Sequence, residues 1–153
     1  MGTKFFFEFF VNEKIFTKYF IPANFSKLAE FKNDAIYFKG FNLFLNLEEA
    51  KILIHSKKLQ NAIDASIAIF KRIRTETSLT IVTDGPNFAC GVSNEEVVKV
   101  QPEVIKGSKS RLGAGDAFFA YFLSYKELHP SASLKKSLHA ANRKTENYLQ
   151  NND

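Results

Sequence analysis

The stretch Gly113-Ala-Gly-Asp-Ala-Phe118 governs most expectations for this 153-residue chain. Two glycines around an alanine let the backbone turn tightly and bring its amide groups close to a ligand. The segment Ala117 to Tyr125 is almost wholly apolar and predicts a helix that is stopped by Pro130 and buried on all sides in a domain core. The unpaired amides and the positive dipole end of such a helix favour an anion, typically phosphate.

Asp116 is expected at the mouth of this anion site, where its carboxylate could take a proton from an attacking hydroxyl. In phosphoryl transfer the protein mainly positions groups and neutralises charge, so one carboxylate beside an anion site is a sensible minimum. The alternative is structural, because an acidic residue near a helix start also interacts with the helix dipole while the glycines form an ordinary turn. The residues themselves leave both interpretations open.

Upstream of this stretch, strand patterns alternate with helix patterns, which favours an α/β sheet covered by helices. The expected elements are a strand at 41–45, helices at 47–57 and 60–74, a strand at 78–83, a hairpin-like pair at 88–92 and 97–100, and a last helix from Ser131 or Ser133 to Leu149. A turn is expected at residues 84–86, where Asp, Gly and Pro follow one another.

Helical spacing also predicts which residues share one face of a helix. In the second helix the expected apolar-spaced face holds Ile63, Ile67, Phe70 and Arg74. In the last helix the expected face holds Leu134, Leu138, Ala141 and Tyr148.

The first 35 residues differ in character from the rest. Twelve of the seventeen phenylalanines lie within residues 1–44. Residues 5–20 predict strands with a turn near Asn12, ended by Pro22, and no chemistry is assigned to them. We therefore divide the chain into a Phe-rich segment of unclear status, 1–35, and a single domain that carries the chemistry, 36–153.

Composition excludes several classes of function. The net charge is +5, but the basic residues are scattered in pairs, which favours a solvated surface over a nucleic-acid site. One cysteine, Cys90, excludes an internal disulfide and predicts a small buried side chain. No apolar run reaches the roughly 18 residues of a membrane span, and no signal peptide is recognisable, so we expect a cytoplasmic protein.

With its apolar helix, the stretch at 113–118 resembles the signature of the ribokinase/PfkB family of carbohydrate and nucleoside kinases. This resemblance implies a ribokinase-like three-layer α/β/α sandwich of Rossmann-like type, with ATP and Mg²⁺ as cofactors. It implies that Asp116 is the general base for a substrate hydroxymethyl group. The backbone amides of Gly113, Ala114 and Gly115 would form the anion hole for the transferred phosphoryl group.

Two further stretches match this family in the right order. Asn46-Leu-Glu-Glu49 resembles its Asn-x-x-Glu element. The resemblance implies that Asn46 and Glu49 help to position the nucleotide phosphates and, indirectly, the magnesium ion. Asn46 and Glu49 also fit a helix capping box, and both roles can hold together. Thr83-Asp-Gly85 resembles the Thr-x-Gly turn that lies against the nucleotide, and its alternative is a simple turn.

Near the C-terminus, Ala141-Asn142 resembles the Ala-Asn pair that lines the adenine pocket of the family. Lys106, Lys109 and Arg111 precede the glycine turn and could add positive potential for a polyphosphate. A solvated loop is an equal interpretation of these three residues.

The resemblance covers roughly residues 36–150, and the chain departs from the family in three ways. Family members are longer, and nothing in residues 1–35 resembles their Gly-Gly element, sugar-gripping Asp or lid strands. Ser110-Arg-Leu112 stands where the family usually has Asp-Thr-Thr, which puts potassium activation in doubt. The chain also stops at Asp153, short of the family's closing segment. We therefore expect a sandwich truncated on its N-terminal side.

The leading expectation is an ATP-dependent phosphotransferase that moves the γ-phosphoryl group to a hydroxymethyl group of a sugar or nucleoside. The alternative is a catalytically incomplete nucleotide-binding fragment or interaction subunit without the sugar lobe, and a third is the inert remnant of a split gene. Neither nucleic acid nor membrane is an expected partner. The Phe-rich segment, a second copy or another chain could cover the sheet edge that truncation exposes.

Overall fold

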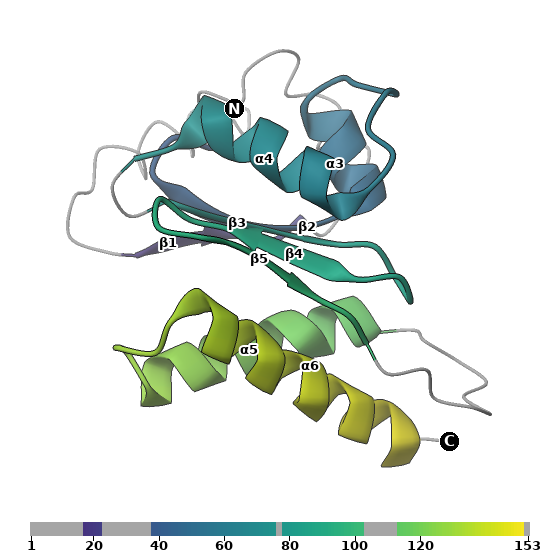
Figure 1. Cartoon of the computed structure of the whole chain (residues 1–153), viewed down its shortest axis with the longest axis vertical. Coiled ribbons are helices and arrows are strands. Elements are labelled where there is room, and N and C mark those ends of the chain that lie inside the picture. The colour runs from purple at the N-terminus through teal and green to yellow at the C-terminus, as the bar shows by residue number, and fades with distance from the viewer. Residues whose placement is uncertain (1–16, 23–37, 76–77, 103–112, 152–153) are drawn as a thin grey trace, which may run out of the picture.

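The computed structural model describes residues 17–22, 38–75, 78–102 and 113–151. In these ranges a five-stranded sheet lies between two pairs of helices, so the predicted α/β class and its three layers are confirmed (Figure 1). The elements are β1 (Lys18–Phe20), β2 (Phe41–Asn46), α3 (Leu47–Leu53), α4 (Ala62–Ile73), β3 (Leu79–Thr83), β4 (Ala89–Val92), β5 (Val97–Val100), α5 (Ala114–Leu128) and α6 (Leu134–Asn151). No helix in the described ranges is long and apolar enough to cross a membrane.

The strands lie side by side in chain order, and β1, β2 and β3 are parallel whereas β4 and β5 run antiparallel to their neighbours. Because β2 and β3 are parallel, their carboxyl ends meet at one edge, where Asn46 is the register partner of Thr83. Crevices at the carboxyl ends of parallel strands are where open α/β sheets bind ligands. The motifs at residues 46 and 83 are therefore brought to the same edge of the sheet.

Strand β1 comes from the Phe-rich segment and pairs Tyr19 with Asn42 of β2. A strand within residues 1–35 therefore belongs to the same sheet as the later elements. The strands and the turn expected between residues 5 and 16 lie outside the described residues.

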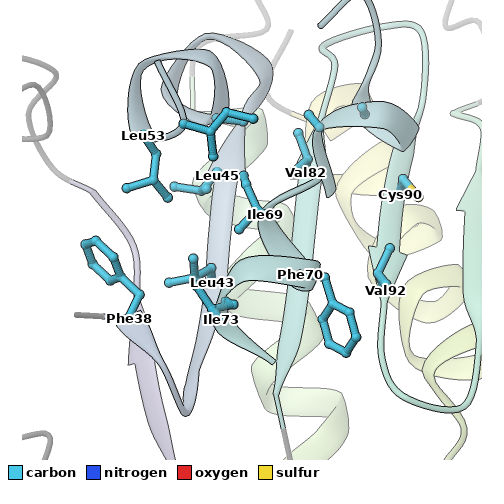
Figure 2. Close-up of a cluster of buried hydrophobic side chains, with 14 of the residues drawn as sticks. Phe38, Leu43, Leu45, Leu53, Ile69, Phe70, Ile73, Val82, Cys90 and Val92 are labelled. Carbon is cyan, nitrogen blue, oxygen red and sulfur yellow. The ribbon is translucent and has the colours of Figure 1, made fainter. Parts of the chain in front are cut away.

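One apolar core lies between the sheet and the α3–α4 layer (Figure 2). Side chains of β2 and α4, such as Leu43 and Ile73, point toward one another there. Of the face predicted for α4, Phe70 is buried and Ile63 and Ile67 are half-buried against this core, whereas Arg74 is exposed beyond the helix end. The buried residues are Ala62, Ala65, Ser66, Ile69, Phe70 and Ile73. The most deeply buried stripe of α4 therefore lies beside the predicted one.

The second core lies between the sheet and the α5–α6 layer. Phe44 of β2 stacks on Phe119 of α5, with ring centroids 4.9 Å apart. The expected burial of α5 on all sides is wrong, because Ala120 and Ser124 are exposed and Leu128 is 76% exposed. The described residues cover only the side of α5 that faces the sheet and α6.

Helix α6 begins after Ser133, whose hydroxyl accepts a bond from the Lys136 amide at 3.3 Å, as one of the two expected caps requires. Leu134 and Leu138 are buried on the predicted face. Tyr148 is 38% exposed, and Thr145 and Leu149 are buried instead. Close packing on the sheet requires a glycine: a Cβ atom at position 91 of β4 would lie 2.7 Å from Leu138 Cδ1.

Two smaller expectations concern the α3–α4 side. Helix α3 ends at Leu53, earlier than the expected residue 57. Two residues after the helix, His55 has a positive φ of 50°. Cys90 is fully buried, as its apolar surroundings predicted.

Candidate functional site

Two adjoining cavities lie where the carboxyl ends of β2 and β3 meet the start of α5. The α6 cavity has a volume of about 260 Å³. It is lined by Asn46, Thr83, Gly85, Phe88, Ala89, Pro102, Ala114, Gly115, Phe118, Asn142, Thr145, Glu146 and Leu149. The Asp116 cleft, about 510 Å³, is lined by Ile21, Pro22, Asn46, Glu49, Gly113, Gly115 and Asp116. Asn46 and Gly115 border both spaces, so the two cavities are neighbours.

The first turn of α5 presents bare backbone to this site. Gly113 is the N-cap with φ 78°, and no side chain caps the helix. The first helical bond joins the Ala117 amide to the Gly113 carbonyl at 2.9 Å, so the three amides before it have no helical acceptor. No atom lies within 4 Å of the place where Gly115 would carry a Cβ. The turn therefore has both the amide donors and the open space that an anion requires.

Asp116 is the third residue of α5 and is exposed to solvent. It lines the same cleft as Glu49, and the two carboxylates are close enough for the charge of Asp116 to act on Glu49. The pKa of Glu49 is raised chiefly by burial and further by Asp116, while the Asn46 amide lowers it in part. The cleft thus holds one accessible carboxylate and one half-buried carboxylate.

Asn46 and Glu49 form the capping box that their spacing predicted. The Glu49 amide donates to Asn46 Oδ1 at 2.9 Å, and the Asn46 amide donates to Glu49 Oε2 at 2.7 Å. These reciprocal bonds satisfy the start of α3 and hold both side chains at the border of the cleft. The structural interpretation is therefore confirmed, and it leaves room for a second role.

The donor set fits a magnesium ion held jointly with a ligand. No group of three His, Cys, Asp or Glu residues within the described ranges could bind a metal by itself. Glu49 and Asp116 nevertheless bring two carboxylates to the cleft, with the amide of Asn46 beside them. Mg²⁺ is usually bound by one or two carboxylates together with substrate phosphates and water.

The turn after β3 brings Thr83 and Gly85 to the α6 cavity. The Asp84 amide donates to the Phe88 carbonyl at 2.8 Å, and Gly85 has φ 50°, which favours glycine there. The predicted turn is confirmed. Its glycine-containing backbone forms part of the cavity wall.

Asn142 enters the cavity from α6 and is held in place from two sides. Its side-chain nitrogen donates to the Gln101 carbonyl at 3.3 Å and to Glu146 Oε1 at 2.8 Å. The structure thus brings every predicted site residue to one of the two cavities. These residues are Asn46, Glu49, Thr83, Gly85, Gly113, Ala114, Gly115, Asp116 and Asn142.

No model of a protein family and no curated protein matches the sequence. Solved structures do match, among them a Clostridium perfringens protein described as a sugar kinase, with a TM-score of 0.73 and 17% identity over 95% of this chain and 44% of the other. A Schistosoma mansoni adenosine kinase in complex with 2-fluoroadenosine matches with a TM-score of 0.61 and 23% identity over 80% of this chain and 39% of the other. The fold is ribokinase-like.

A further ribokinase-like match is a protein named ribokinase II from Escherichia coli, in complex with ATP and Mg²⁺. Its TM-score is 0.56 with 17% identity, over 73% of this chain and 34% of the other. The chain thus spans less than half of the length of these three structures, from 34% to 44%.

Sequence reasoning missed several residues that line these two cavities. Thr145, Glu146 and Leu149 line the α6 cavity at three, four and seven positions after Asn142. That spacing is one face of a helix, so the match at Asn142 could have revealed them. Ile21 and Pro22 line the Asp116 cleft although the segment that holds them was assigned no chemistry. Only the three-dimensional pairing of β1 brings them there.

Other expectations fall on residues 103–112, which lie outside the described ranges. They concern the positive potential of Lys106, Lys109 and Arg111, and the Ser110-Arg-Leu112 sequence beside the glycine turn. Both stay predictions.

Proposed function

We propose that this chain belongs to the ribokinase/PfkB family and transfers the γ-phosphoryl group of ATP to a hydroxymethyl group of a sugar or nucleoside. One observation carries the proposal: the uncapped start of α5 and the Asp116 carboxylate lie in the same cleft, at the carboxyl ends of β2 and β3. Phosphoryl transfer needs an anion site and an aligned proton acceptor side by side.

The phosphoryl group would be held by backbone amides. Ala114 lines the α6 cavity and Gly115 lines both cavities, and the amides of these two residues have no helical acceptor. Such donors, already oriented before the reaction, stabilise charge that develops in the transition state. The positive end of the α5 dipole adds to this attraction.

Asp116 would accept the proton of the attacking hydroxyl. Its exposure lets an acceptor substrate approach, and its place in the first helical turn puts it beside the proposed phosphoryl site. The capping box holds the side chains of Asn46 and Glu49 in position. From there the two side chains would orient a magnesium ion that is bound to the nucleotide phosphates. When bound, Mg²⁺ neutralises phosphate charge during transfer.

The nucleotide would extend from this point into the α6 cavity. Thr83 and Gly85 form one wall, and Asn142 lies on α6. Phe88, Pro102 and Phe118 add apolar surface suited to a planar base.

A specific observation favours the alternative of a nucleotide-binding chain without turnover. The chain covers 34–44% of the three matched structures, and in the described residues the Asp116 cleft is bounded on its β1 side only by Ile21 and Pro22. No described polar group on that side would grip a sugar. The two proposals separate when ATP binding and turnover are measured together across a panel of sugars and nucleosides. Binding without turnover on any acceptor would favour the alternative.

The test of the catalytic proposal is Asp116→Asn. Loss of a general base lowers turnover by roughly 100- to 10,000-fold, while nucleotide affinity should stay close to that of the wild type. Asp64→Asn is a matched control, because Asp64 is likewise exposed and is the third residue of its helix, α4, on the far side of the sheet. Both substitutions remove the same helix-dipole interaction. Unchanged turnover in Asp116→Asn would refute the assignment of the base.

A further inference from the structure

The lining of the Asp116 cleft combines two kinds of chemistry. Asp116 and Glu49 bring carboxylates to the cleft, whereas Ile21 and Pro22 line it on the side of β1. The Ile21 side chain is 42% exposed, so much of its apolar surface is open to a ligand. A molecule that fills the cleft therefore meets a proton acceptor and an apolar surface together.

This apolar surface continues along β1, at the edge of the described sheet (Figure 1). Tyr19 lies two residues before Ile21, and alternate residues of an extended chain share one face. The Tyr19 ring stacks on Phe44 with the centroids 5.8 Å apart, and Phe44 belongs to the core on the α5–α6 side of the sheet. Tyr19 is itself 44% exposed. We call Tyr19, Ile21 and Pro22 the β1 surface.

The charges around the cleft disfavour an anionic acceptor. In the described ranges two carboxylates line the cleft and no Lys or Arg does. The basic residue of β1, Lys18, lies on the other face of the strand, with its Nζ 5.8 Å from the centroid of the Phe41 ring in the α3–α4 core. A phosphorylated acceptor would bring its charge toward the carboxylates, and like charges placed side by side disfavour binding.

We propose that the phosphate acceptor is a nucleoside whose hydroxymethyl group lies at Asp116 and whose base packs on the β1 surface, an inference that rests on the proposed function. A nucleoside is uncharged, and its base has a planar apolar face that a free sugar lacks. The hydroxyl groups of a sugar lose their hydrogen bonds to water when they lie against apolar side chains. The β1 side of the cleft, which offers a sugar no described polar partner, therefore favours a base. The volume of about 510 Å³ is ordinary for a small-molecule site.

Calorimetry on the whole chain tests the proposal in the presence of Mg²⁺ and a saturating non-hydrolysable ATP analogue. The analogue fills the α6 cavity, so an added nucleoside reports on the Asp116 cleft alone. Methyl ribofuranoside is the matched ligand, because it shares the ring and the hydroxymethyl group of adenosine and uridine but lacks a base. Both nucleosides should bind at least about 30-fold more tightly than the riboside, on the ordinary gain in affinity per ligand atom. Fructose 6-phosphate, a charged sugar with a free hydroxymethyl group, should bind no more tightly than the riboside.

A pair of matched variants tests the β1 surface. Ile21→Thr keeps the branched Cβ but removes apolar area at a position that is already partly exposed. It should weaken nucleoside binding about fivefold and change riboside binding by less than about twofold. Val97→Thr is the control, because Val97 is 55% exposed on β5, at the opposite edge of the described sheet, and lines neither cavity. It should keep the wild-type preference, and circular dichroism checks that both variants fold.

The outcomes separate this inference from the proposed function. Nucleosides that bind no more tightly than the riboside, or less tightly than fructose 6-phosphate, would overturn the acceptor class without bearing on phosphoryl transfer. Equal nucleoside affinity in folded Ile21→Thr and Val97→Thr would overturn the role of the β1 surface. Preferential binding of nucleosides without phosphorylation when ATP replaces the analogue would support the acceptor class and contradict the proposed function.

Discussion

Gly113 begins α5 with φ 78°, a left-handed conformation that glycine adopts at little cost. A Cβ atom at this position would meet no neighbour within 4 Å, so strain in the backbone is the only penalty for adding one. We expect Gly113→Ala to lower the free energy of unfolding by about 1–2 kcal/mol, measured by urea denaturation. The start of α5 should also shift, which would weaken nucleotide binding.

Gly115→Ala is the matched comparison, because Gly115 lies within the same helix and has no positive φ. Alanine in a helix is more favourable than glycine, so this variant should gain up to about 1 kcal/mol of stability. Its new Cβ enters the open space beside the proposed phosphate, and nucleotide affinity should fall. Loss of stability in both variants would contradict the conformational explanation.

Glu49 predicts a pH dependence of stability. Burial and Asp116 raise its folded pKa above the ordinary value of 4.5, so the folded state favours the protonated form. The stabilisation linked to Glu49 is therefore complete below that value and is lost as the pH rises through the raised folded pKa. Glu49→Gln does not titrate and can keep the capping bond.

Urea unfolding from pH 4 to pH 7 should show the wild type losing stability relative to Glu49→Gln as the pH rises. Asp116→Asn removes the neighbouring charge and should reduce this loss. The difference in unfolding free energy between the wild type and Glu49→Gln should therefore change with pH. If it stays constant, or changes in the opposite direction, the cleft does not raise the pKa of Glu49.

At the scale of elements, α3 and α4 both begin with an asparagine N-cap, but only the N-cap of α3 borders the site. Asn46 and Asn61 are both N-caps whose side chains accept the amide three residues later, at 2.9 Å in each case. Replacing either with alanine should lower the free energy of unfolding by about 1 kcal/mol. Only Asn46→Ala should weaken Mg²⁺-nucleotide binding, measured by calorimetry, because Asn61 does not line either cavity. Equal losses of affinity in both variants would show that Asn46 acts only through stability.

Short-range signals explain what the sequence predicted correctly about these elements. The capping box at residues 46–49, the turn at 84–86 and the hairpin of β4 and β5 depend on residues a few positions apart. The buried faces of α4 and α5 depend on what packs against them. Ala62 and Ala65 are buried although they are small, and one side of α5 is exposed although its sequence is apolar.

At the scale of the whole molecule, the site unites segments that the sequence keeps far apart. Four motifs from the ends of β2 and β3, the start of α5 and the middle of α6 were predicted individually, and the sheet brings them to one edge. The parallel pairing of β1 with β2, which carries Ile21 and Pro22 to the Asp116 cleft, has no local signal. Periodicity and turn chemistry cannot predict contacts between strands that are separated by about twenty residues of sequence.

The shared sheet also predicts that both helical layers unfold together. Ile69 of α4 and Ile81 of β3 are fully buried in the two cores on opposite faces of the sheet. Ile→Val at either position should lower stability by about 0.5–1.5 kcal/mol, because each removes one buried methylene. Since β2 and β3 contribute side chains to both cores, each variant should reduce hydrogen-exchange protection equally in the most protected amides of α4 and α6. If Ile81→Val reduced protection in α6 alone, the layer that carries Asp116 and Asn142 would open independently of the rest. Nucleotide binding would then raise hydrogen-exchange protection only in the α5–α6 layer. If the molecule is a single cooperative unit, nucleotide binding must raise protection in α4 as well.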